Sequence, residues 1–139
     1  MSNRSSPAFG CTDTEMVSLD FDETTFKTVR YWARRALNWH KLGGFIILKS
    51  SECCYHVVFN RTVDWTENMK IAAWVAELSG NFGLQKWHRM QCIKVGSTLR
   101  ISCKGEKLPP RVVYREGKQD EQIVEFEKFR KMIKKSIHA

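Results

Sequence analysis

Residues 45–61 read FIILKSSECCYHVVFNR, two runs of β-branched and aromatic residues around a short polar segment. This pattern predicts a β-hairpin. In its second run Tyr55, Val57 and Phe59 share one parity, which indicates the core face of the strand. His56 has the opposite parity, so we expect its side chain on the other face of the sheet.

Strand and helix patterns continue on both sides of this hairpin. Period-two alternation indicates strands, and apolar residues at three- and four-residue intervals indicate helices. The predicted elements, in chain order, are strand 16–21, helix 24–41, strand 45–51, strand 55–61, helix 64–81, shorter helix 82–96, strands 97–105 and 110–117, and helix 120–137. This order predicts an α+β fold in residues 16–139, after a flexible leader at 1–15. The simplest packing is a ferredoxin- or RRM-like βαββαβ sheet with helices on one face and an extra C-terminal helix. That layout leaves one sheet face open for a ligand.

Composition narrows the class of protein. The chain has 139 residues, 42% of them hydrophobic, and no apolar run near the roughly 18 residues of a membrane span. Its N-terminus lacks the apolar segment of a signal peptide, so we expect no membrane partner. Five cysteines without C-x-x-C spacing indicate free thiols in a reducing, cytoplasmic environment: Cys11, Cys53, Cys54, Cys92 and Cys103.

The net charge of +8 is concentrated in residues 84–119, where nine basic residues face only Glu106 and Glu116. Such a basic region is typical of proteins that bind phosphate polymers, although it is also compatible with a surface that serves solubility. The predicted nucleic-acid contacts are Lys86, Arg89, Lys94, Lys107, Arg111 and Arg115.

Two carboxylates are the strongest candidates for chemistry. Strand alternation in SLDFD places Asp20 and Asp22 on one face, opposite Leu19 and Phe21. Carboxylates at i and i+2 favour a shared divalent cation, and hard oxygen ligands suit Mg²⁺ or Mn²⁺. Alternatively, Asp22 belongs to the strand-to-helix turn, where it caps the helix or meets solvent.

His56 and Arg100 are expected on the same open face as the two carboxylates. There His56 would donate a hydrogen bond to a phosphate, or simply be a polar surface residue. Arg100 alternates with Leu99 and Ile101, and its planar guanidinium suits a phosphate. The alternative for Arg100 is an ion pair with one of the aspartates.

The five tryptophans raise the possibility of base stacking. Trp32, Trp74 and Trp87 lie in predicted helices that need core residues, so we expect structural roles for them. Trp39 and Trp65, near the ends of elements, are the exceptions.

Three stretches resemble the archaeo-eukaryotic primase (prim-pol) superfamily: VSLDFDETTF (17–26), LKSSECCYHVVF (48–59) and STLRISCKGEKLPPRVVY (97–114). They are similar to the superfamily's hydrophobic-Asp-hydrophobic-Asp strand, its histidine strand after a Ser/Gly turn, and an arginine segment. The resemblance implies a primase-polymerase palm, that is, a nucleotidyltransferase of DNA replication. It also implies Mg²⁺ or Mn²⁺, nucleotides, single-stranded or primer-template DNA or RNA, and other replication proteins as partners.

The resemblance further implies roles for particular residues. Asp20 and Asp22 would be the catalytic metal ligands. The nucleotide contacts would be Ser50, Ser51, His56, Arg100 and Lys104. The chain departs from the family pattern at Ser102-Cys103, where members have Pro-Gly. A third acidic residue, which members carry on a neighbouring strand, is not found in a predicted strand after Phe59, so the palm would be minimal or degenerate.

Three other classes of protein are compatible with the same elements. A non-catalytic nucleic-acid-binding domain would use the basic region alone. A rolling-circle nickase would need two histidines at i and i+2, whereas YHVVF supplies only His56. A small interaction protein with incidental charge is the third.

Overall fold

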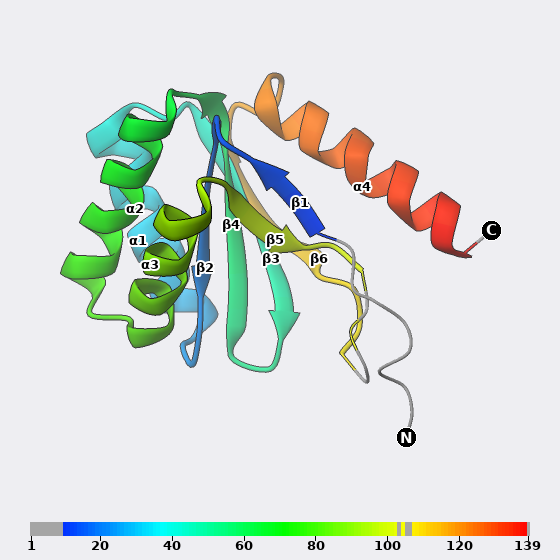
Figure 1. The fold of residues 1–139 in the computed structure, drawn as a ribbon, viewed down its shortest axis with the longest axis horizontal. Helices are drawn as coiled ribbons and strands as arrows, with labels where there is room; N and C mark the ends of the chain where they lie inside the picture. Colours follow the sequence, from blue (N-terminus) through cyan, green and yellow to red (C-terminus); the bar gives the residue numbers. More distant parts are fainter. Residues whose placement is uncertain (1–9, 103, 105–106, 139) are drawn as a thin grey trace.

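A computed structural model of the chain describes residues 10–102, 104 and 107–138. A four-stranded sheet lies at its centre, with three helices on one face and the C-terminal helix on the other (Figure 1). The elements are β1 (Gly10–Asp13), β2 (Met16–Phe21), α1 (Phe26–His40), β3 (Gly44–Ser51), β4 (Cys54–Thr62), α2 (Trp65–Ser79), α3 (Phe82–Lys94), β5 (Ser97–Arg100), β6 (Arg111–Gly117) and α4 (Gln122–His138). The predicted α+β class is confirmed.

The main sheet has the strand order β2-β4-β3-β6, and each neighbouring pair is antiparallel. The β3–β4 hairpin therefore lies at its centre, which explains why both of its strands are so apolar. The order from β2 to β5 is βαββααβ, which resembles the expected βαββαβ order with one helix added, and β5 pairs with β1 in a separate two-stranded sheet. β1 lies within the expected leader; residues 1–9 of that leader lie outside the described part of the chain.

Local signals explain where the helices begin and end. The Thr25 side chain accepts a hydrogen bond from the backbone N–H of Thr28 and caps α1, and the Asp64 side chain does the same for α2. α1 ends at Lys41 and α2 at Gly80, both in the left-handed conformation. These caps determine where α1 and α2 begin and end.

The first hydrophobic core lies between the sheet and α1, α2 and α3. Tyr55, Val57 and Phe59 of β4 belong to it, as the strand parity predicted, together with Leu19 and Phe21 of β2. α1 contributes buried alanines, which let the helix approach the sheet closely.

A second core covers the opposite face, so the structure differs from the expected open face. Ile46 and Val58 of the hairpin contact Phe126 of α4, and Leu99 of β5 joins them. The physical reason lies in the hairpin itself, because its strands are apolar on both faces and both faces must be buried. Within the described residues, no helix is both long and apolar enough to cross a membrane.

Candidate functional site

Asp20 and His56 are direct cross-strand neighbours on the second face of the sheet. The distance from His56 Nε2 to Asp20 Oδ1 is 3.6 Å. His56 is 4% exposed, whereas about a third of the Asp20 side chain, 32%, remains open to solvent. His56 therefore shares a face with Asp20, as parity predicted, but it is buried rather than displayed.

Burial shifts the pKa of both groups toward their neutral forms. The pKa of Asp20 rises to about 7, mainly through burial and also through the negative charge of Asp22, against the attraction of Arg100 and Lys107. Burial and the neighbouring Arg100 lower the pKa of His56 to about 3. At neutral pH the histidine is thus uncharged, and the Asp20 carboxyl is close to half protonated.

Asp22 lies in the turn after β2 rather than in the strand. Its Oδ1 accepts hydrogen bonds from Cys54 Sγ at 2.7 Å and from the Glu23 N–H at 3.1 Å. Its backbone carbonyl accepts one from Asn81, which also caps α3. Asp22 lines a shallow cleft of about 450 Å³ at the start of α3, together with Lys86. The structure therefore shows the turn alternative for Asp22.

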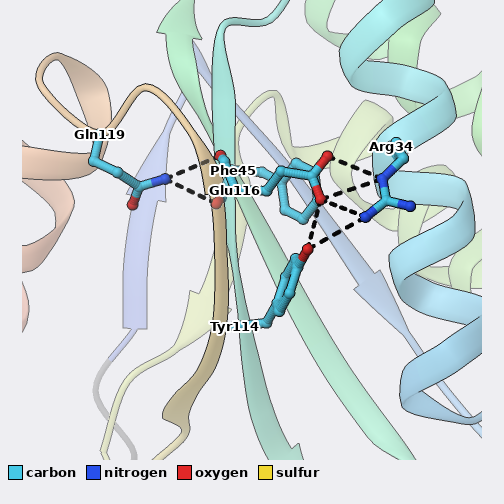
Figure 2. Close-up of polar contacts among 5 residues, drawn as sticks. All are labelled: Arg34, Phe45, Tyr114, Glu116 and Gln119. Carbon is cyan, nitrogen blue, oxygen red and sulfur yellow. Dashed lines mark hydrogen bonds and ion pairs between the residues drawn. The ribbon is translucent and has the colours of Figure 1, made fainter.

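The expectation that no strand after Phe59 contains an acidic residue is wrong. Glu116 lies in β6, but its side chain points to the first face, toward α1 (Figure 2). Its Oε1 lies 2.7 Å from Arg34 Nη2 and accepts a hydrogen bond from the Tyr114 hydroxyl at 2.6 Å. The arginine and the tyrosine lower the pKa of Glu116. Since Asp20 faces the other side of the sheet, Glu116 does not complete its site.

Two side chains remain as candidate metal ligands, the carboxylates of Asp20 and Asp22. In the part of the chain that the structure describes, no group of three or more His, Cys, Asp or Glu side chains is arranged for a metal. Mg²⁺ usually binds proteins through one or two carboxylates and takes its remaining ligands from water and substrate phosphates. Asp20 and Asp22 are two such carboxylates, but Asp22 Oδ1 is hydrogen-bonded to Cys54 and to the Glu23 N–H, and we derive no chemical step through a cation.

Arg100 ties two segments of the protein together. Its guanidinium donates to the backbone carbonyls of Ser50 at 2.6 Å and Leu108 at 2.9 Å, and also to that of Ser102. These bonds join the end of β3 to the segment between β5 and β6. Hydrogen bonds to backbone carbonyls were not among the roles considered for Arg100.

A basic cleft of about 760 Å³ opens beside this arginine, between the β3–β4 turn, residues 101–102 and 107–111, and α4. Part of its lining is apolar and includes Leu108 and Pro109. Arg130 donates to the Pro110 carbonyl at 2.8 Å and so anchors α4 to this wall. The cleft is lined by six cations, Lys49, Lys107, Arg111, Arg130, Lys131 and Lys134, and by two acids, Glu52 and Glu127.

The structure brings together only some of the predicted contacts. Those that line the basic cleft are Ser50, Ser51, Lys107 and Arg111. Lys86, Arg89 and Lys94 are exposed on α3, on the other side of the molecule from α4. Arg115 forms an ion pair with Glu127, with 2.6 Å between Nη2 and Oε1. The backbone of Lys104 pairs with that of Lys107 in an isolated antiparallel β-bridge.

Four cations of the cleft were not among the predicted contacts: Lys49, Arg130, Lys131 and Lys134. The spacing of the last three supplies a signal. Residues three and four apart are neighbours on a helix surface, so Lys134 lies beside both Lys131 and Arg130, and the three form one basic face of α4.

Comparisons with protein-family models, with curated proteins and with solved structures gave no match for this chain. The fold and the site define an α+β protein with a split βαβ sheet, a part-buried Asp–His pair and a basic cleft.

Proposed function

We propose that this chain binds the phosphate backbone of nucleic acid in the basic cleft. The observation that carries the proposal is the charge of its lining, six cations against two carboxylates. One of those carboxylates, Glu127, is already paired with Arg115, and the other, Glu52, lies 3.9 Å from Lys49. Concentrated positive charge in a concave surface attracts phosphates and releases their counterions.

The apolar side chains that line the cleft favour the binding of a single strand over that of a duplex. Leu108 is 77% exposed, and Pro109 and Ile133 lie beside it. A duplex buries its base faces in its own stack, whereas a single strand exposes them to contact with apolar side chains. A nucleic-acid-binding role agrees with the resemblance to replication proteins and needs no metal.

The test compares two variants of equal charge on the same helix. Lys131→Glu/Lys134→Glu changes the cleft, and Lys128→Glu/Lys135→Glu changes exposed lysines that do not line it. Binding of a labelled single-stranded 20-mer would be measured by fluorescence anisotropy over a series of salt concentrations.

We expect the cleft variant to bind more weakly. Its slope of log K against log salt should fall by about 1.4, because each lost phosphate contact removes about 0.7 for a single strand. If both variants weaken binding equally, only net charge matters and the cleft is not the site.

A second candidate function is metal-dependent nucleotidyl transfer by a primase-like palm. It is favoured by the position of Asp20, a part-buried carboxylate that Asp22 destabilises in its charged form. A divalent cation bound by both groups would supply the missing positive charge, and the phosphates of a nucleotide would complete its ligands.

This candidate is tested by titrating Mn²⁺ into the protein with and without a nucleoside triphosphate, followed by electron paramagnetic resonance. Wild type should bind the cation more tightly when the nucleotide is present, and Asp20→Asn/Asp22→Asn should not. Glu77→Gln, which removes an exposed carboxylate of α2, is the control. If wild type shows neither cooperative binding nor incorporation on a template, this candidate is rejected, and the cleft proposal is unaffected.

A further inference from the structure

The outward face of α1 carries an unusual combination of side chains. The helix contains four cations, Lys27, Arg30, Arg34 and Arg35, and no acidic residue. Two of its aromatic residues are exposed, Tyr31 at 52% and Trp39 at 69%. α1 covers the first face of the sheet, so this surface lies on the opposite side of the molecule from the basic cleft (Figure 1).

Trp39 is held flat against a second tryptophan. Its ring is stacked on that of Trp74 in α2, with 6.0 Å between centroids and 12° between planes. The ring of His40 meets Trp74 edge-on at 4.9 Å, which holds Trp74 in place. Trp39 thus contacts the protein through its ring while much of the ring remains open to solvent. This contact favours one orientation of the ring.

Tyr31 and Arg35 continue this surface along the helix. The Tyr31 hydroxyl accepts a hydrogen bond from Arg35 Nη1 at 3.0 Å, and its ring meets Trp32 edge-on at 5.1 Å. The Arg35 guanidinium lies 5.6 Å from the centroid of the Trp32 ring. Tyr31, Arg35 and Trp39 are spaced four residues apart, so they lie on one side of the helix over about 12 Å. That span equals the rise of three to four stacked nucleotides at about 3.4 Å each.

A shallow hollow of about 470 Å³ follows the same side chains. It is lined by Tyr31, Arg34, Arg35, Asn38 and Trp39. The Asn38 amide has both donors and an acceptor for a base edge. Arg34 is paired with Glu116 (Figure 2). Arg35 is the cation beside the Tyr31 ring, with its guanidinium 5.8 Å from the ring centroid.

We propose that this α1 stripe, Tyr31, Arg35, Asn38 and Trp39, is a second binding surface, on which bases of single-stranded nucleic acid stack. Flat exposed rings beside a guanidinium are the elements of a sequence-tolerant stacking platform. The lack of any carboxylate on the helix complements a polyanion. A protein partner is disfavoured because anchor residues at protein interfaces occupy deep, desolvated pockets, and this hollow is shallow. The proposal is independent of the cleft.

The test measures binding of a single-stranded oligonucleotide and of an abasic oligonucleotide of the same length, at a salt concentration that weakens backbone contacts. Wild type should prefer the strand that has bases. Trp39→Ala should weaken its binding about 5- to 150-fold, the range for loss of one stacked base. Trp39→Phe should retain most of the affinity, and Tyr31→Ala should weaken it. Leu78→Ala removes an apolar side chain of α2 that is as exposed as Tyr31, and it should leave the affinity unchanged.

The same measurement in the Lys131→Glu/Lys134→Glu background separates the two proposals. If the α1 stripe binds bases by itself, Trp39→Ala weakens binding by the same factor with or without the cleft lysines. Should Trp39→Ala unfold the protein, Trp39→Phe and Tyr31→Ala carry the comparison. Equal binding of the normal and abasic strands, or full affinity in both Tyr31→Ala and Trp39→Ala, would overturn the proposal and leave an acidic protein segment as the alternative occupant.

Discussion

Replacing Asp20 by asparagine should stabilise the protein at pH 8 and leave its stability unchanged at pH 4. The pKa of Asp20 rises from its ordinary 3.8 to about 7 in the folded protein, mainly because of burial. Between these two values the folded chain holds a proton that the unfolded chain has released. The free energy of unfolding therefore falls as pH rises from about 4 to 7 and is level above that range. Asparagine has nearly the same shape, carries no charge and avoids this loss.

The size of the effect follows from the same values. A full shift from 3.8 to about 7 corresponds to an upper limit of about 4 kcal/mol at pH 8. Because 32% of the Asp20 side chain is exposed to water, screening reduces the expected gain of Asp20→Asn to about 1–2 kcal/mol. Urea denaturation at pH 4, 6 and 8, followed by tryptophan fluorescence, measures it. Glu77→Gln controls for the loss of one negative charge from a basic protein.

His56 makes the wild-type pH profile informative as well. Its pKa falls from 6.5 to about 3, so its contribution to stability is lost as pH falls from about 6.5 toward 3. Between pH 4 and 6.5 the unfolded chain keeps a proton on the histidine, and the folded chain keeps one on Asp20. In wild type the two groups therefore change the free energy of unfolding in opposite directions as pH rises. In Asp20→Asn only the contribution of His56 remains. The reasoning would be refuted if Asp20→Asn were less stable than wild type at pH 8, because Asp20 would then be ionised and paired with a charged His56.

Three further substitutions test the packing around the site. Phe126→Ala should lower the free energy of unfolding by about 3–5 kcal/mol, measured by urea denaturation, because this α4 side chain fills the second core. Met132→Ala, which changes an exposed side chain of the same helix, should lower it little. Gly83→Ala should cost about 1–3 kcal/mol, because its Cβ would lie 2.2 Å from Asp22 Cβ; wild-type stability would argue against this contact. Arg100→Lys should cost about 1–3 kcal/mol, because one ammonium cannot reach all the carbonyls that the guanidinium joins; a neutral result would remove its bridging role.

Strand parity predicted the parts of the structure that depend on one strand alone. The core face of β4 follows from Tyr55, Val57 and Phe59, and the shared face of Asp20 and His56 follows from the same period of two. Helix caps such as Asp64 are equally local, because the capping side chain bonds to the backbone three residues away. Within such short distances the sequence leaves few alternatives.

Contacts between distant segments were beyond this kind of inference. The second core joins Val58 to Phe126, and nothing local to either element shows that α4 crosses the second face. The cleft lysines of α4, Lys131 and Lys134, were not predicted for the same reason, because the position of α4 was not known. Arg100 reaches Ser50 across fifty residues, so its carbonyl partners could not be read from alternation. Asp22 departed from the strand because Asn81 binds its backbone and holds the turn.

The two proposed surfaces are connected by one structural element, the edge strand β6. Arg111 at its start lines the basic cleft, and Glu116 near its end holds Arg34, which lines the hollow of the α1 stripe. Five residue steps of a strand cover about 17 Å, and the α1 stripe adds about 12 Å. A single strand that follows this edge would need at least about nine stacked nucleotides at about 3.4 Å each, because the cleft itself and the passage between the two faces add to this length. If one strand occupies both surfaces, affinity should rise steeply once the oligonucleotide exceeds about nine nucleotides, and both the cleft and the stripe variants should abolish that rise. If the surfaces act separately, short oligonucleotides should instead bind with a stoichiometry of two per chain.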